Sequence, residues 1–218
     1  MGPPLIRVFH GDRERVLAKV YRFIESSAKV FLKEKGLFNL CLAGGRTPEE
    51  LYRTMGRIYP FFDRTLIVPT DERLVPEEDP RNNCTMIREF LGSRAKLRRV
   101  KTELEPLKAC GEFNKTLSEV GPPDLTLLGL GEDGHTASLF PGRECRPCGR
   151  FACITEGPDG LLRVSVTLEY INSSCYAVFL VLGKRKREAL KMLLSGENIP
   201  ASRVRPRRGV FVFTDLPL

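Results

Sequence analysis

The stretch DLTLLGLGEDGHTASLFPG, residues 124–142, joins a short apolar run to a glycine-rich loop that contains a histidine. The run is shorter than an ordinary helix and is bounded by turn residues, which predicts a buried β-strand. Three other runs share this character, namely FNLCLA (38–43), AVFLVLG (177–183) and GVFVFTD (209–215). Strands that are apolar on both faces are typical of a parallel sheet covered by helices on both sides.

Segments with apolar residues at helical spacing alternate with these runs. Arg13 to Lys35 is the longest of them. In TPEELYRTM we expect Thr47 to be the N-cap, Pro48 the first helical residue and Glu50 the end of a capping box. Further helices are expected at 82–91, 109–120 and 187–194, and further strands at 64–73 and 161–171. This alternation predicts an α/β fold with a mainly parallel sheet.

Four loops that follow predicted strands carry unusual chemistry. They are AGGRTP (43–48), PTDER (69–73), GLGEDGH (129–135) and GKRK (183–186). Because ligands bind at the carboxyl ends of strands in such sheets, we expect the four loops to meet in one site.

Gly129, Gly131 and Gly134 have the GxGxxG spacing of a dinucleotide-binding loop. That function would require a full helix after the loop and an acidic residue about twenty positions on, where Glu156 stands. However, HTASLF allows at most two helical turns, and the PGRECRPCGR that follows cannot continue a helix, which leaves no room for the crossover helix. We therefore expect no NAD(P), and interpret the loop as an anion-binding backbone nest beside His135. A histidine there can serve as a general base, or it can merely cap a short helix.

The chain has 218 residues, of which 42% are apolar, and a net charge of +8. The charge fits either a basic surface or the attraction of an anionic substrate. The basic run at 184–187 resembles a nucleic-acid patch, but its position between a strand and a helix predicts the first turn of that helix. We expect neither a nucleic-acid nor a membrane partner, and the sequence leaves the oligomeric state open.

Seven scattered cysteines favour reduced thiols and a cytoplasmic location over a disulfide framework. Cys145 and Cys148 form a lone CxxC, for which no further zinc ligands are apparent, so ordinary thiols and no metal are expected. The first sixteen residues show no signal-peptide pattern. His10 is isolated and is expected at the surface.

The motifs GLGEDGHTASLFPG, LAGGRTPEELY and TDERLVPEEDPRNN, in this order and spacing, resemble those of the 6-phosphogluconolactonase family. LRVSVTLEYIN, LGKRKREAL and IPASRVRP resemble its later segments, so the likeness covers nearly the whole chain. It implies a single catalytic domain, residues 1–218, with a Rossmann-like three-layer α/β/α sandwich related to glucosamine-6-phosphate deaminase. The implied reaction is hydrolysis of 6-phospho-D-glucono-1,5-lactone in the oxidative pentose phosphate pathway. The alternatives are a deaminase-like sugar-phosphate enzyme and a non-catalytic sugar-phosphate sensor.

The resemblance also implies roles for individual residues. His135 would be the general base, and Asp133 would orient its ring or simply form a turn. The amides of the loop from Gly129 to Gly134 would stabilise an oxyanion. Asp71 would bind sugar hydroxyls or hold Arg73. The implied substrate- and phosphate-binding residues are Gly44, Gly45, Arg46, Thr47, Asp71, Arg73, Gly131, Arg163 and Lys186.

For three of the cations a structural alternative stays open. Arg73 could form an ion pair with Asp71 or Glu72, and Arg163 and Lys186 could be solvated surface residues. Arg46 stands where the family commonly has a small hydroxyl residue, and Ser165 where it often has threonine.

Overall fold

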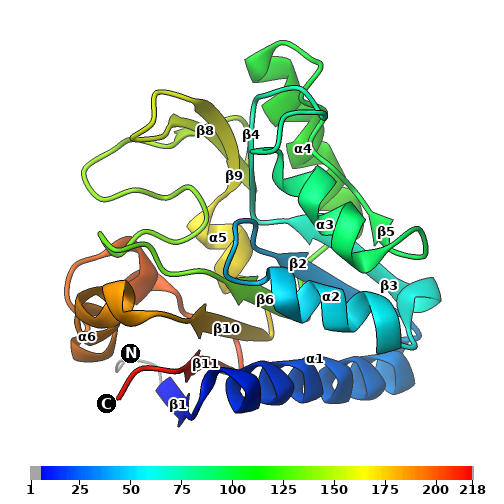
Figure 1. Ribbon diagram of the computed structural model, residues 1–218. Coiled ribbons are helices and arrows are strands. Elements are labelled where there is room, and N and C mark those ends of the chain that lie inside the picture. Colours follow the sequence, from blue (N-terminus) through cyan, green and yellow to red (C-terminus); the bar gives the residue numbers. More distant parts are fainter. Residues whose placement is uncertain (1–5, 218) are drawn as a thin grey trace.

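The computed structural model describes residues 6–217, and its centre is a seven-stranded sheet (Figure 1). All paired strands in this sheet are parallel, as the apolar runs predict. The strand order across the sheet is β1 (Ile6–His10), β11 (Gly209–Thr214), β10 (Tyr176–Val181), β6 (Leu125–Leu128), β2 (Phe38–Leu42), β3 (Thr65–Pro69) and β5 (Lys96–Leu97). β1 and β5, the two edge strands, were not expected from the sequence.

Helices cover both faces of the sheet, so the predicted three layers are confirmed. One apolar cluster joins the sheet to α1 (Arg13–Lys35), α2 (Glu49–Ile58) and α3 (Asn83–Leu91). A second cluster on the opposite face includes α4 (Pro106–Val120), α5 (Leu168–Asn172) and α6 (Arg187–Ser195). Burial of strand side chains on both faces explains why the strand sequences are continuously apolar.

The predicted capping box at the start of α2 is wrong. Pro48 is the N-cap, the helix begins at Glu49, and no side chain caps it. A turn in which the N–H of Glu49 is donated to the carbonyl of Arg46 precedes the helix. Thr47 therefore lies before the helix, in the loop that follows β2, and its side chain does not cap the helix.

A second, antiparallel sheet was missed by the sequence analysis. It has the order β4 (Asp71–Arg73), β9 (Leu162–Val166), β8 (Ala152–Glu156) and β7 (Arg146–Pro147). The expected strand at 64–73 is divided at Thr70, so that β3 stays in the main sheet and β4 enters the small one. The expected strand at 161–171 ends at Val166, because Thr167 caps α5. The small sheet thus extends directly from the carboxyl end of β3.

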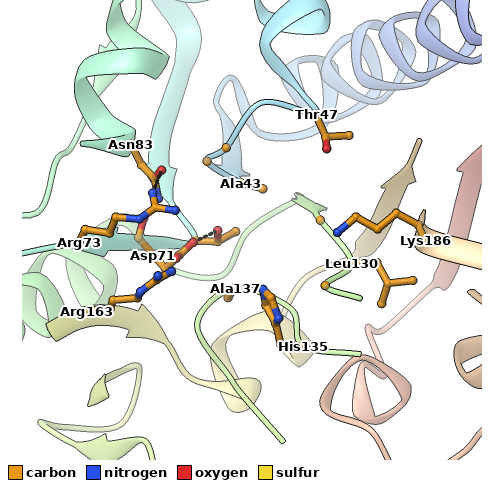
Figure 2. A pocket seen from close by; sticks show the side chains of 15 residues that line it. Ala43, Thr47, Asp71, Arg73, Asn83, Leu130, His135, Ala137, Arg163 and Lys186 are labelled. Carbon is orange, nitrogen blue, oxygen red and sulfur yellow. Dashed lines mark hydrogen bonds between the residues drawn. The ribbon is translucent and has the colours of Figure 1, made fainter. Parts of the chain in front are cut away.

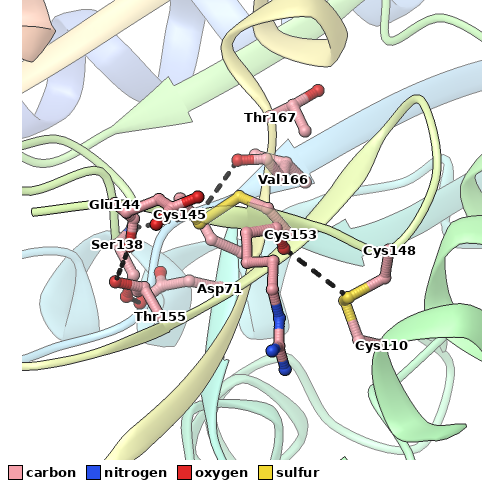
Figure 3. The surroundings of a disulfide bond; sticks show 12 residues. Asp71, Cys110, Ser138, Glu144, Cys145, Cys148, Cys153, Thr155, Val166 and Thr167 are labelled. Carbon is pink, nitrogen blue, oxygen red and sulfur yellow. Dashed lines mark hydrogen bonds between the residues drawn. A yellow bond between two sulfur atoms is a disulfide. The ribbon is translucent and has the colours of Figure 1, made fainter. Parts of the chain in front are cut away.

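Two disulfides contradict the expectation of reduced thiols. Cys110 pairs with Cys148 and Cys145 with Cys153, whereas Cys41, Cys84 and Cys175 are free and buried. Each cysteine of the CxxC joins a different element, α4 in one case and β8 in the other (Figure 3). The packing of α4 against β8 brings these partners together, and that packing is not visible as a sequence spacing.

No helix within residues 6–217 is long and apolar enough to cross a membrane. Residues 1–5, on which part of the signal-peptide expectation rests, lie outside the described residues. His10 is exposed at the end of β1, as expected.

Candidate active site

The four loops singled out in the sequence line one pocket, which confirms their predicted convergence (Figure 2). They follow β2, β3, β6 and β10, which are adjacent in the main sheet. β9 of the small sheet and the start of α3 complete the wall. The lining residues are Ala43, Gly44, Gly45, Thr47, Thr70, Asp71, Arg73, Asn83, Gly129, Leu130, Gly131, His135, Ala137, Arg163 and Lys186.

His135 lies in this pocket with one ring nitrogen held by a carboxylate. Its Nδ1 is 2.5 Å from Oδ1 of Asp133, and the same oxygen accepts the backbone N–H of His135 at 3.1 Å. Burial alone would raise the pKa of Asp133, but these hydrogen bonds and the charge of the imidazole lower it below its ordinary value. Asp133 therefore both forms the turn and orients the imidazole. A carboxylate on Nδ1 favours the tautomer that leaves Nε2 with a free lone pair.

Two neighbours fix the plane of the His135 ring. Phe140 packs against it, with ring centroids 4.7 Å apart. A Cβ on Gly131 would overlap both Nδ1 of His135 and the Asp133 carboxylate. Glycine is required at this position because the ring occupies the space of a side chain. HTASLF forms no helix, and an isolated β-bridge between Thr136 and Leu139 closes the turn instead.

The loop offers fewer amides for an oxyanion than the sequence suggested. Gly131 donates its N–H to the carbonyl of His135, and Gly134 donates its own to the carbonyl of Gly131. Of the loop residues that line the pocket, Gly129 and Leu130 donate their N–H to no acceptor within residues 6–217.

Arg73 forms no ion pair with Asp71 or Glu72, so that alternative is wrong. Its Nη1 donates to the carbonyl of Arg81 at 3.0 Å and to Oδ1 of Asn83 at 2.8 Å. Both acceptors are neutral, and no carboxylate within residues 6–217 lies within ion-pair distance of the guanidinium. The positive charge of Arg73 is therefore left for a ligand.

Arg163 lies directly opposite Arg73 in the antiparallel pairing of β4 and β9. It is buried rather than solvated, with 8% of its surface exposed. Nη2 donates to Asp159 at 2.7 Å, whereas Nε is buried without a hydrogen-bond partner among the described residues. Like charges placed opposite each other destabilise a sheet. The pair is therefore an arrangement that an anion would stabilise.

Lys186 enters from the other side of the pocket, so it too is not simply a surface residue (Figure 2). It ends the 3-10 turn η2 (Lys184–Lys186) that precedes α6, and is partly buried. Thr47, Gly44 and Gly45 line the pocket as predicted, but Arg46 is exposed and is not among the lining residues.

Asp71 is a buried carboxylate whose oxygens are held by hydroxyl groups. Thr70 donates to Oδ1 at 2.9 Å and Ser138 donates to Oδ2 at 2.6 Å. Ser138 in turn receives support from Ser165, whose hydroxyl accepts its backbone N–H. Sequence reasoning did not identify Ser138 as a site residue, although it lies within the histidine motif.

Glu72 is fully buried next to these residues and does not line the pocket. Burial raises its pKa above the ordinary value, although hydrogen bonds from the Cys84 thiol and from the backbone N–H groups of Asn83 and Cys84 oppose this shift. No group of three or more His, Cys, Asp or Glu side chains within the described residues is arranged to hold a metal ion.

The family model for glucosamine-6-phosphate isomerases and 6-phosphogluconolactonases matches residues 11–213. The chain belongs to this family. The 6-phosphogluconolactonase of Thermotoga maritima is 32% identical over 200 residues, which cover 88% of this chain and 87% of that protein. The 6-phosphogluconolactonase of a Nostoc species is 30% identical over 204 residues, 84% of this chain and 82% of that protein.

Solved structures of the glucosamine-6-phosphate isomerase and 6-phosphogluconolactonase family share this fold. The crystal structure of the Thermotoga maritima 6-phosphogluconolactonase matches with a TM-score of 0.88 at 29% identity, covering 96% of this chain and 99% of that one. A monomeric glucosamine-6-phosphate deaminase matches with a TM-score of 0.81 at 22% identity, covering 95% and 96%. The second likeness shows that the two enzyme types share one architecture.

Proposed function

We propose that the protein hydrolyses 6-phospho-D-glucono-1,5-lactone to 6-phospho-D-gluconate, as the names of its relatives indicate for those enzymes. The observation that carries the proposal is a histidine with one nitrogen on a carboxylate, in a pocket that also holds three cationic side chains. This combination suits a substrate with an ester carbonyl at one end and a phosphate at the other.

In the proposed reaction, Nε2 of His135 takes a proton from a water molecule as the water oxygen bonds to C1 of the lactone. The carbonyl oxygen becomes an oxyanion, for which the amides of Gly129 and Leu130 are the available donors in this loop. When the intermediate collapses, the bond between C1 and the ring oxygen breaks, and the ring oxygen receives the proton from His135. Asp133 stabilises the imidazolium that exists between these two steps.

The phosphate is assigned to the cationic side chains. Arg73 and Arg163 offer it two adjacent guanidinium groups, and among the described residues Arg73 has no carboxylate partner. Lys186 supplies a further contact from the opposite wall. Thr47, Gly44 and Gly45 line the same pocket and would contact polar atoms of the substrate, and Asp71 would accept hydroxyl groups of the sugar. Arg46 is not needed in this arrangement.

To test the proposal, purified protein is added to freshly generated 6-phosphogluconolactone, and the rate of acid release is compared with the rate of spontaneous hydrolysis. His135→Ala serves as the matched protein control. A rate equal to the spontaneous one would reject the proposal. Ammonia release from glucosamine 6-phosphate in a parallel assay would instead support the deaminase alternative. Binding of sugar phosphates without turnover of either substrate would support a sensor.

A further inference from the structure

We propose that Asn83, at the start of α3, is a positioning residue that aims the guanidinium of Arg73 into the pocket. The inference rests on the proposed role of Arg73 in binding the anionic substrate. Asn83 was not singled out from the sequence, although it is the last residue of the TDERLVPEEDPRNN motif and the first residue of the helix that follows it.

The hydrogen bonds of Arg73 show which of its edges is free. A guanidinium has five N–H donors, two of them on Nη1. Both Nη1 donors are used, one by Oδ1 of Asn83 and one by the carbonyl of Arg81. Nε and Nη2 of Arg73 donate to no acceptor within residues 6–217, so three N–H groups in a fork remain for a ligand.

The orientation of Asn83 is itself determined by its surroundings. Its Nδ2 donates to the backbone carbonyl of Asp71 at 3.0 Å, which requires that its amide oxygen face Arg73. The side chain lies against Gly44 in space that a Cβ there would fill, and only 4% of Asn83 is exposed. Asn83 therefore has one available conformation, and Arg73 is held by a fixed acceptor.

The buried carboxylate of Glu72 fixes the distance between the two residues. It accepts the backbone N–H groups of Arg73 at 2.9 Å, Asn83 at 2.7 Å and Cys84 at 2.6 Å. One side chain thus ties the end of β4 to the first turn of α3, where a negative charge is also favourable for the helix dipole. Because Glu72 bonds to the backbone of both residues, the side chain of Asn83 on α3 is held at a fixed distance from Arg73 on β4.

A double-mutant cycle tests whether Asn83 acts through Arg73. We expect Asn83→Ala to raise KM for the phosphorylated lactone about tenfold, while kcat changes less than twofold, because the lost acceptor misplaces a binding group. Hydrolysis of unphosphorylated gluconolactone should change much less than hydrolysis of the phosphorylated lactone. In an Arg73→Ala background, Asn83→Ala should have no further effect.

Asn82→Ala is the matched control. Asn82 is the neighbouring amide and caps α3 by accepting the N–H of Thr85, but it does not contact Arg73. It should lower stability by about 1 kcal/mol without altering KM selectively. If Asn83→Ala does not fold, the nearly isosteric Asn83→Leu replaces it. Leucine offers Arg73 no acceptor and should again raise KM for the phosphorylated substrate selectively.

The outcomes separate the two proposals. Effects of Asn83→Ala and Arg73→Ala that simply multiply would overturn the positioning role and leave the lactonase proposal intact. The same cycle measured by calorimetric binding of 6-phosphogluconate needs no turnover. If Arg73→Ala binds 6-phosphogluconate as tightly as the parent does, Arg73 does not bind the phosphate. The positioning role of Asn83 would then be overturned as well, because it rests on that assignment.

Discussion

Replacement of Arg73 by alanine tests the electrostatic argument for the site most directly. Within residues 6–217 this guanidinium has no carboxylate partner, and it lies opposite Arg163 in the pairing of β4 with β9. If it binds the phosphate, its removal should cost one charge-assisted interaction, about 1.5–3 kcal/mol. That corresponds to a loss of roughly ten- to a hundredfold in kcat/KM for the phosphorylated lactone.

The stability of Arg73→Ala should change much less than its activity. Removal of Arg73 relieves its like-charge pairing with Arg163 but also removes its hydrogen bonds to Asn83 and to the carbonyl of Arg81, so the free energy of unfolding of the unliganded Arg73→Ala protein should differ from that of the parent by only about 1 kcal/mol. Added 6-phosphogluconate should raise the melting temperature of the parent protein and raise that of the variant much less. Thermal unfolding with and without the ligand measures both effects.

Unphosphorylated gluconolactone provides the internal control, because it offers no anion for Arg73 to bind. An equal loss of activity on both lactones would refute the reasoning, since Arg73 would then act on the lactone ring or on site structure. If Lys186→Ala gave the selective loss and Arg73→Ala did not, the phosphate would belong to the opposite wall of the pocket. Loss of activity in the double variant smaller than the product of the single losses would indicate a shared phosphate.

Three further outcomes are expected. His135→Ala should lower kcat by about 10²–10⁴ with an unchanged circular dichroism spectrum, and activity within a few-fold of the parent would exclude the general base. Asp133→Asn should lower kcat by at most about 10⁴, since the ring would lose its orienting carboxylate. The pKa of Asp133 is lower in the folded protein than its unfolded value of about 3.9. The stability that this carboxylate contributes should therefore be present above a pH of about 3.9 and be lost as the pH falls through its folded pKa. The free energies of unfolding of the parent and of Asp133→Asn should converge below that folded pKa. Cys110→Ser with Cys148→Ser should lower the free energy of unfolding by about 4 kcal/mol, and Cys145→Ser with Cys153→Ser by about 2.5 kcal/mol, because the enclosed loops span 38 and 8 residues. Denaturant titration checks the order, and equal values would argue against the loop-entropy account.

The main sheet could be predicted because each of its inner strands is a continuous apolar run. The site could be predicted because four such runs end in loops rich in glycine or charge, and parallel strands place their carboxyl ends together. The small antiparallel sheet could not be predicted, since β4 and β9 pair across residues far apart in the sequence. For the same reason the sequence did not reveal that Arg73 and Arg163 are neighbours, or that Asn83 reaches back to Arg73.

The disulfides were missed for a reason that is linked to the loop that carries His135. The absence of a crossover helix after GLGEDGH argued against a dinucleotide site, and the structure indeed has no helix between β6 and β8. A helix would have buried an apolar stripe against the sheet, whereas no residue from 141 to 150 is buried. Packing alone therefore provides little to hold this return segment. Cys145 and Cys148 attach it covalently to β8 and α4 instead, just beyond the motif that carries His135 and Phe140. The segment between β6 and β8 has no helix that could pack against the sheet, and the two disulfides hold it in place instead.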